Sequence, residues 1–284
     1  MNRVWATEIG RLPTCKVFET MAARSFTSAT RPAVAVFARA SGRAAAMRDE
    51  LARRTALARQ DAPLGVTAPG LPLLAGEMAA LLPKGRRSPI DHAARKPRPV
   101  MVLPGFAAHP IAMRAMIAAL NKAGHRARDW GQGFNLSPDE AEMTALTARL
   151  EAQAEREGEP VALIGWSLGG VVARELAKRS PQSVSLVITM GSPISGDRRA
   201  NNAWRLYQFV TGHPVDAPPI VAEISAKPPV PTYAMWSPRD GIVAPRAAAG
   251  RPGERDRAIA LRCRHLGFAR DPEAIAAVLQ LLDE

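Results

Sequence analysis

From about residue 99 onward, short apolar runs alternate with longer segments whose apolar residues recur at helical spacing. The short runs predict strands at residues 99–103, 125–130, 161–166, 184–190, 231–237 and 258–263. The longer segments predict helices over residues 110–123, 139–156, 168–178 and 272–282. Because parallel strands need crossover connections, this alternation predicts a parallel sheet with helices on both faces.

The strand at 161–166 leads directly into a Gly-x-Ser-x-Gly turn formed by Gly165, Ser167 and Gly169. A strand, a tight turn and a helix in this order present a serine hydroxyl as a nucleophile. Glycines flank the serine because bulky side chains would clash across so sharp a turn. The alternative is a serine that caps a helix in a Gly-rich loop. The strand and helix on either side favour the nucleophile.

A nucleophilic serine needs a base and an acid that orients the base. Asp240 stands in a turn after the strand at 231–237, and His265 follows the strand at 258–263. Both positions fall at carboxyl ends of strands, where open α/β sheets place their sites. Taken singly, Asp240 is also consistent with an ordinary Asp-Gly turn and His265 with a loop or capping histidine. The rival acids are Asp216, in a Pro-rich segment, and Asp256, at the amino end of the last strand.

Two backbone N–H groups are candidates for an oxyanion hole. Leu168 follows the nucleophile, and Phe106 follows Pro104-Gly105 after the first strand. Only the backbone of Phe106 would act, so the shape of its loop matters more than its side chain. Without the serine turn, Pro-Gly would indicate only a break between strand and loop.

Four phrases carry a family resemblance: Val-Leu-Pro-Gly-Phe at 102–106, Ile-Gly-Trp-Ser-Leu-Gly-Gly at 164–170, Ser-Pro-Arg-Asp-Gly-Ile-Val at 237–243 and His-Leu-Gly-Phe at 265–268. Through them the chain from about residue 99 to 284 resembles the bacterial lipase and esterase branch of the α/β-hydrolase superfamily.

The resemblance implies an α/β-hydrolase fold with a reduced, mainly parallel sheet. It also implies Ser167 as nucleophile, His265 as base and Asp240 as orienting acid, with Phe106 and Leu168 as oxyanion donors. The chain departs from many lipases in having Pro-Gly where they carry His-Gly. The two antiparallel strands that open larger members have no obvious counterpart before Val100.

Charge divides the chain unevenly. Residues 1–98 hold 17 Lys/Arg against 7 Asp/Glu, whereas residues 99–284 hold 21 against 19. We expect residues 1–98 to be a basic extension, partly disordered or helical, and residues 99–284 to be the catalytic domain. A basic patch of this kind suits a solvated tail or an anionic membrane surface. It lacks the interleaved aromatic residues of a nucleic-acid module, so no nucleic-acid partner is expected.

No segment predicts a membrane span or a signal peptide. The apolar stretch Leu71–Leu82 has 12 residues and includes Glu77, short of the roughly 20 residues that cross a bilayer. The expected location is the cytoplasm, with peripheral membrane contact through the basic extension. Two cysteines, Cys15 and Cys263, suit a reducing compartment, and Cys263 is expected to be a small buried hydrophobe in the last strand.

Residues 192–231 are too long for a plain connection and predict a cap. They hold the aromatic helical stretch that contains Trp204 and Tyr207, followed by a Pro-rich tract. The functional interpretation is a lid that supplies apolar substrate contacts, and the structural alternative is a helix packed permanently on the domain. Trp166 and His109 are further candidates for the pocket, although His109 is also placed to cap the helix at 110.

The sequence therefore predicts a serine hydrolase that cleaves carboxylic esters, with lipid-like or apolar acyl esters favoured by the apolar cap. No cofactor is expected, and no Cys/His cluster has the spacing of metal ligands. Two alternatives stay open: an acyltransferase that uses the same triad, and a non-catalytic protein of this fold that binds an apolar ligand or a partner.

Overall fold

The computed structural model describes residues 30–80, 92–220 and 223–284. The chain divides into two units, residues 1–53 and residues 54–284. In the first unit, the described residues belong to helix α2, which spans Thr30–Ala58 and continues into the second unit. Everything that bears on the candidate site lies in the second unit.

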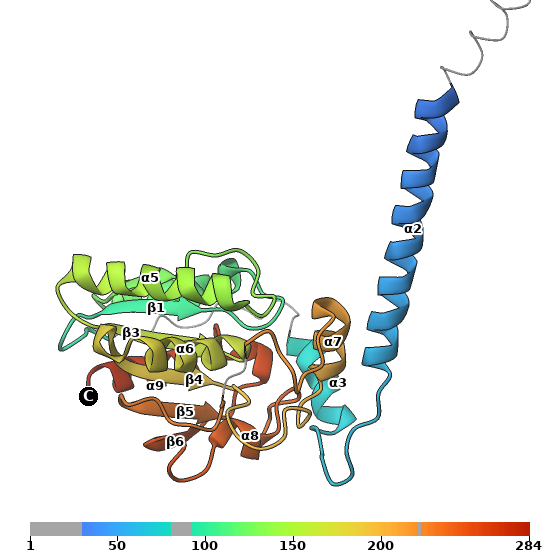
Figure 1. Ribbon diagram of the computed structural model, residues 1–284. Helices are drawn as coiled ribbons and strands as arrows, with labels where there is room; N and C mark the ends of the chain where they lie inside the picture. The colour runs from blue at the N-terminus through green and yellow to red at the C-terminus, as the bar shows by residue number, and fades with distance from the viewer. Residues whose placement is uncertain (1–29, 81–91, 221–222) are drawn as a thin grey trace, which may run out of the picture. The chain divides into compact units, whose positions relative to one another are not determined.

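A six-stranded sheet forms the centre of the second unit (Figure 1). Its order is β2-β1-β3-β4-β5-β6, and every neighbouring pair is parallel. The strands are β1 (Pro99–Leu103), β2 (Arg126–Asp129), β3 (Val161–Trp166), β4 (Val184–Met190), β5 (Thr232–Trp236) and β6 (Arg257–Ala260). Strands β1 and β3 are buried along their whole length, which explains their continuous apolar sequence.

Helices cover both faces of the sheet. The helical segments of this unit are α3 (Leu71–Ala80), η1 (Pro110–Met113), α4 (Arg114–Lys122), α5 (Glu140–Glu157), α6 (Leu168–Arg179), η2 (Pro181–Ser183), α7 (Trp204–Thr211), α8 (Pro245–Ala249), η3 (His265–Gly267) and α9 (Pro272–Leu282). Helices α4 and α9 pack on one face, and α5 and α6 pack on the other. This confirms the predicted fold class, a reduced parallel sheet between two helical layers.

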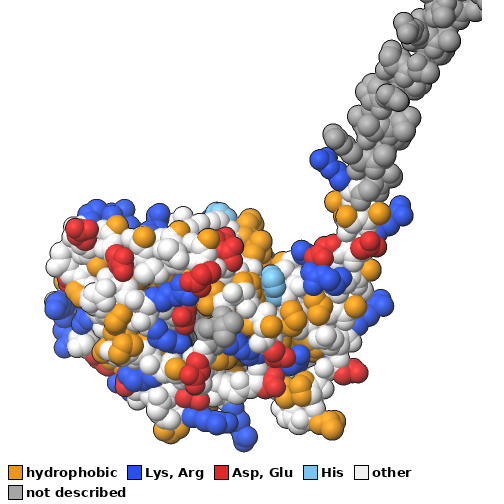
Figure 2. Space-filling view, in the orientation of Figure 1, with side chains coloured by type: hydrophobic (Ala, Val, Ile, Leu, Met, Phe, Trp, Pro, Cys, Tyr) orange, Lys and Arg blue, Asp and Glu red, His pale blue; other side chains and the backbone are white. Residues whose placement is uncertain are grey.

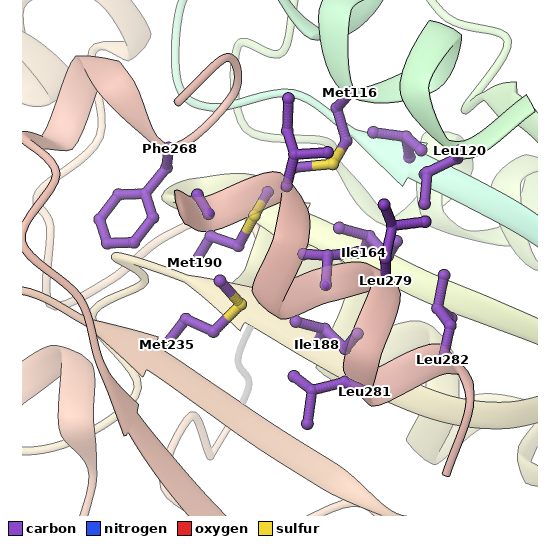
Figure 3. Close-up of a cluster of buried hydrophobic side chains, with 14 of the residues drawn as sticks. Met116, Leu120, Ile164, Ile188, Met190, Met235, Phe268, Leu279, Leu281 and Leu282 are labelled. Carbon is purple, nitrogen blue, oxygen red and sulfur yellow. The ribbon is translucent and has the colours of Figure 1, made fainter. Parts of the chain in front are cut away.

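The core under α9 shows how alternate strand residues build each layer (Figure 3). Ile164 of β3 and Ile188 of β4 are fully buried on the same side as Leu279 and Leu282 of α9. Their neighbours in sequence, such as Leu163, face α5 and α6 in the other layer. The period of two along each strand thus separates the two cores.

Helix α3 belongs to the second unit and packs against η3, although it precedes the sheet in sequence. It lies in the basic stretch that the sequence sets apart as an extension. Two segments of that stretch, residues 1–29 and 81–91, and with them Cys15, fall outside the described residues. The expected membrane contact therefore stays a prediction.

The last strand is shorter than predicted. Strand β6 ends at Ala260, so the prediction that Cys263 lies in a strand is wrong. Leu261 N–H still donates to Trp236 O of β5, but the chain then leaves the sheet, and Arg262 N–H donates to Glu273 Oε2. Cys263 is nevertheless buried, and this burial raises the pKa of its thiol.

On the face of the second unit that Figure 2 shows, basic and acidic side chains are interspersed rather than gathered into a field of one sign. This agrees with the near balance of charge in residues 99–284. Within the described ranges of the chain, no helix combines the length and apolar character that a membrane crossing requires.

Candidate active site

Ser167 lies in the turn between β3 and α6, at the carboxyl edge of the sheet. Its backbone has φ 54° and ψ −121°, a region that costs a non-glycine residue about 1–3 kcal/mol. A Cβ atom on Gly165 would come within 2.3 Å of Gly169 O, and one on Gly169 within 2.5 Å of Leu103 O. The turn therefore needs both glycines. The Ser167 side chain makes no capping bond to α6, which rules out the alternative of a capping serine.

Asp240 and His265 form a buried pair at the same edge of the sheet. Their side chains are 0% and 2% exposed, and His265 Nδ1 lies 2.8 Å from Asp240 Oδ2. Because a carboxylate only accepts, Nδ1–H donates, and Nε2 keeps the lone pair that a general base needs. The second oxygen, Asp240 Oδ1, accepts from the N–H groups of Ile242 and Val243, each at 2.8 Å. The carboxylate is thus held from two sides.

The rival acids are engaged elsewhere. Asp216 pairs with Arg199 in the insertion. Asp256 accepts from Lys227 Nζ at 2.9 Å and stands just before β6, at the amino edge of the sheet. Among the three acids considered from sequence, Asp240 is therefore the one that the fold brings to His265.

The loop after β1 lies against the serine turn. A Cβ atom on Gly105 would stand 3.3 Å from Ser167 Cβ, so the two segments are in close contact. Within the described part of the chain, the Phe106 N–H has no acceptor. Leu168 is the first residue of α6, so its N–H has no acceptor in a preceding helical turn. Both N–H groups remain able to donate to a ligand beside the serine.

Asn135, which is fully buried, supports this loop from the segment after β2. Its backbone accepts from Ala107 N–H at 2.8 Å and donates to Ala108 O at 3.1 Å. Its side-chain Nδ2 donates to Pro104 O at 2.7 Å. These bonds surround Ala107, whose φ of 54° is unfavourable for a residue with a Cβ. The loop is therefore held in shape by a residue that the sequence analysis did not single out.

An apolar cleft that is partly open to solvent contains Ser167, Leu168 and Phe106 in its wall. Helix α6 contributes Val171 and Val172. The insertion supplies a further wall through α7 and the segment that follows it, including residues 215, 218, 220 and 224. The cleft is suited to an apolar group attached to whatever reacts at the serine.

The four pocket candidates separate into two pairs. Trp204 and Tyr207 of α7 line the cleft. Burial raises the pKa of Tyr207, whose hydroxyl lies 2.9 Å from Ser137 Oγ. The structure places the other two elsewhere: Trp166 Nε1–H donates to His265 O at 3.1 Å, and His109 caps η1. Trp166 thus connects the serine turn with the histidine loop.

The largest omission of the sequence analysis is Glu77 of α3, which is 1% exposed. Its carboxylate accepts from three backbone N–H groups, those of Gly241, His265 and Leu266. The sequence did hold a signal for Glu77, because it is the lone acid in an otherwise apolar helical stretch. A glutamate that is buried with such a stretch is expected to have hydrogen-bond partners.

Comparisons of sequence with known proteins reach part of the chain. A model of the family described as PGAP1-like alpha/beta domain matches residues 140–214, which include β3, Ser167 and α7. No curated protein matches the sequence.

Comparisons of structure extend further. The chain is similar to a Bacillus licheniformis lipase, BlEst2, in its mature form, with 16% identity over 69% of this chain and 96% of that chain, at a TM-score of 0.51. The propeptide form of that lipase gives 15% identity over 69% of this chain and 52% of that chain, also at 0.51. An alpha/beta hydrolase enzyme from the metagenome of lagoon sediments in Morocco shows 19% identity over 66% and 91%, at 0.48.

Proposed function

The chain has the α/β-hydrolase fold, as its motifs predicted, and on that premise we propose that it is a serine hydrolase of carboxylic esters that acts through an acyl-enzyme on Ser167. The observation that carries the proposal is the buried Asp240–His265 pair at the same sheet edge as a serine held at φ 54°. The solved Bacillus licheniformis protein of similar fold is a lipase, which supports the proposal.

The proposed reaction begins when His265 Nε2 takes the proton of Ser167 as its Oγ attacks the ester carbonyl. The tetrahedral oxyanion accepts from the N–H groups of Phe106 and Leu168. His265 then returns the proton to the leaving alcohol, and the acyl group stays on Ser167. A water molecule, deprotonated by His265, releases the acid and restores the serine. Asp240 holds the imidazole in the required tautomer and stabilises its cation.

We further propose esters with an apolar acyl chain as substrates, because the cleft beside Ser167 is walled by valine, isoleucine, proline and aromatic side chains. Each methylene that leaves water for this cleft gains about 0.8 kcal/mol, which corresponds to roughly four-fold in kcat/KM. A panel of esters with increasing acyl length should therefore show rising kcat/KM until the cleft is filled.

The test of the proposal is Ser167→Ala. We expect a folded protein whose ester turnover has dropped by about four to six orders of magnitude and which a fluorophosphonate probe no longer labels. Thermal unfolding checks that the variant is folded. Labelling that persists in Ser167→Ala would exclude Ser167 as the nucleophile. An alcohol acceptor added to the wild-type assay separates acyl transfer from hydrolysis. Acyl transfer yields a new ester, whereas hydrolysis yields the acid.

A further inference from the structure

Glu77 stands out in the second unit as a buried carboxylate that the proposed reaction does not use. Its Oε1 accepts from the N–H groups of Gly241 and His265, each at 2.9 Å. Its Oε2 accepts from the Leu266 N–H at 3.0 Å. Gly241 directly follows the acid of the pair, and the other two donors are the histidine itself and the residue after it. One side chain thus binds both loops that carry the pair.

Helix α3 is docked closely enough to hold this carboxylate in place. A Cβ atom on Gly241 would come within 2.4 Å of Leu73 O, so the acid loop lies directly on the helix backbone. Asn202 Nδ2 donates both to Pro69 O, just before α3, at 2.9 Å and to Gly241 O at 2.7 Å. The loop is therefore fixed to the helix at several points.

A carboxylate that is this deeply buried is stable only with strong compensating donors. Hydrogen bonds to a charged acceptor are stronger than neutral ones, and Glu77 receives three of them. Because the donors come from two loops, the bonds fix the separation of the loops as well as each loop alone. The distance that depends on this separation is the one between Asp240 Oδ2 and His265 Nδ1, which is 2.8 Å.

We propose that Glu77 is a positioning residue for the catalytic pair, which holds the loops of Asp240 and His265 at the spacing that ester hydrolysis requires. The inference rests on the proposed function of that pair. It assigns a role in the active site to α3, a helix that precedes the whole sheet in sequence. Glu77 acts through backbone N–H groups and is not among the residues that line the cleft, so substrate binding should be independent of it.

The test compares Glu77→Gln and Glu77→Ala with wild type in the full chain, using p-nitrophenyl esters well below the unfolding temperature. We expect kcat to fall by about 10- to 100-fold, because small displacements of catalytic groups are costly, with KM within about two-fold of wild type. Glutamine keeps one acceptor oxygen but turns its amide toward an N–H donor, so kcat should fall less in Glu77→Gln than in Glu77→Ala. Should the alanine variant fail to fold, the nearly isosteric glutamine variant carries the test.

Asp283→Asn is the matched control. Asp283 is also a buried carboxylate that joins distant segments, because it accepts from Arg95 N–H at 2.9 Å and lies 3.0 Å from His92 Nε2. It lies at the end of α9, away from the loops of the catalytic pair. We expect Asp283→Asn to lower Tm but leave kcat unchanged.

A second readout does not depend on catalysis. The proton between His265 Nδ1 and Asp240 should give a far-downfield NMR signal, and we expect Glu77→Gln to shift or broaden it while Asp283→Asn leaves it unchanged. If the wild type hydrolyses no ester and takes no fluorophosphonate label, the proposed function fails, and the NMR signal still tests the positioning. Glu77 variants that keep both wild-type kcat and the wild-type signal would overturn the inference, as would a kcat loss that Asp283→Asn reproduces.

Discussion

Helices α3 and α7 both lie at the carboxyl edge of the sheet, but they contact different kinds of surface. Helix α3 meets the loops of Asp240 and His265 through a buried carboxylate and close backbone contacts. Helix α7 turns Trp204 and Tyr207 toward the apolar cleft and leaves Leu206 54% exposed on its other side. The comparison indicates a division of labour, in which one half of the edge fixes charged groups and the other half provides an apolar wall.

The hydrogen bonds that hold the two helices in place also differ. Helix α7 is held through Gln208, which is fully buried, accepts from Val215 N–H at 3.0 Å and donates to Leu57 O. These partners of Gln208 are neutral, and α7 also accepts from the Arg54 guanidinium at Val210 O, at 2.6 Å. The anchor of α3 is a carboxylate with three donors. Changes on the α3 side should therefore act on kcat, and changes on the α7 side should act on substrate preference.

The largest effect is expected at the charged half. Asp240→Asn should lower kcat by about four orders of magnitude, because the amide favours the wrong histidine tautomer and leaves the imidazolium without a counter-charge. His265→Ala should lower kcat at least as far. Steady-state kinetics on the ester panel measure both variants.

Asp216→Asn and Asp256→Asn are the controls for that prediction, since both acids pair away from His265. They should keep near wild-type turnover. If either control loses activity while Asp240→Asn retains it, the acid has been assigned to the wrong loop. The comparison of α3 with α7 would then fail as well, because it depends on that assignment.

An intermediate effect is expected in the cleft. Val171→Phe fills space in its wall and should reduce kcat/KM for long acyl chains by about ten-fold or more, with short chains nearly unaffected. Leu206→Ser, on the exposed side of α7, should leave kcat/KM unchanged for both long and short acyl chains. An equal loss for all chain lengths in Val171→Phe would show that the apolar cleft does not hold the acyl group.

The smallest effect is expected from removing the residues before Pro69. The loss includes Leu57 O, which accepts from the buried Gln208, together with the contacts of Arg54 with Val210 O and of Gln60 O with Arg205. It spares α3, so kcat should be retained, while KM for long esters changes by about two- to ten-fold, the scale of one buried hydrogen bond. The unfolding temperature should fall by a few degrees at most. Gln208→Ala in the full chain should reproduce the change in KM. A large drop in kcat on truncation would show that α3 depends on the residues before it.

The sequence predicted the sheet well because its strands are buried on both faces and carry continuous apolar runs, as in β1, β3 and β4. It overestimated β6, whose residues are half-buried or exposed and whose end depends on where the chain must turn toward His265. Apolar character alone does not mark where a ladder stops at a sheet edge.

The candidate site was predictable where a residue depends on its own local pattern, as Ser167 does on its flanking glycines. The support around it was not. Asn135 bonds to Pro104, 31 positions away, and Glu77 bonds to residues 164 to 189 positions away. Such contacts depend on how distant segments pack together, and the hydrophobic pattern of either segment alone does not reveal them.

The long separation between Glu77 and its partners also bears on the order of folding. Chains are synthesised at about 5–20 residues per second, so α3 exists for many seconds before the loops that satisfy its carboxylate. Contacts between distant positions form late, because closing long loops costs entropy before the contact rewards it. Assembly of the Asp240–His265 pair is therefore expected to coincide with the last step of folding, and a partly folded chain would carry Ser167 before His265 is held in place.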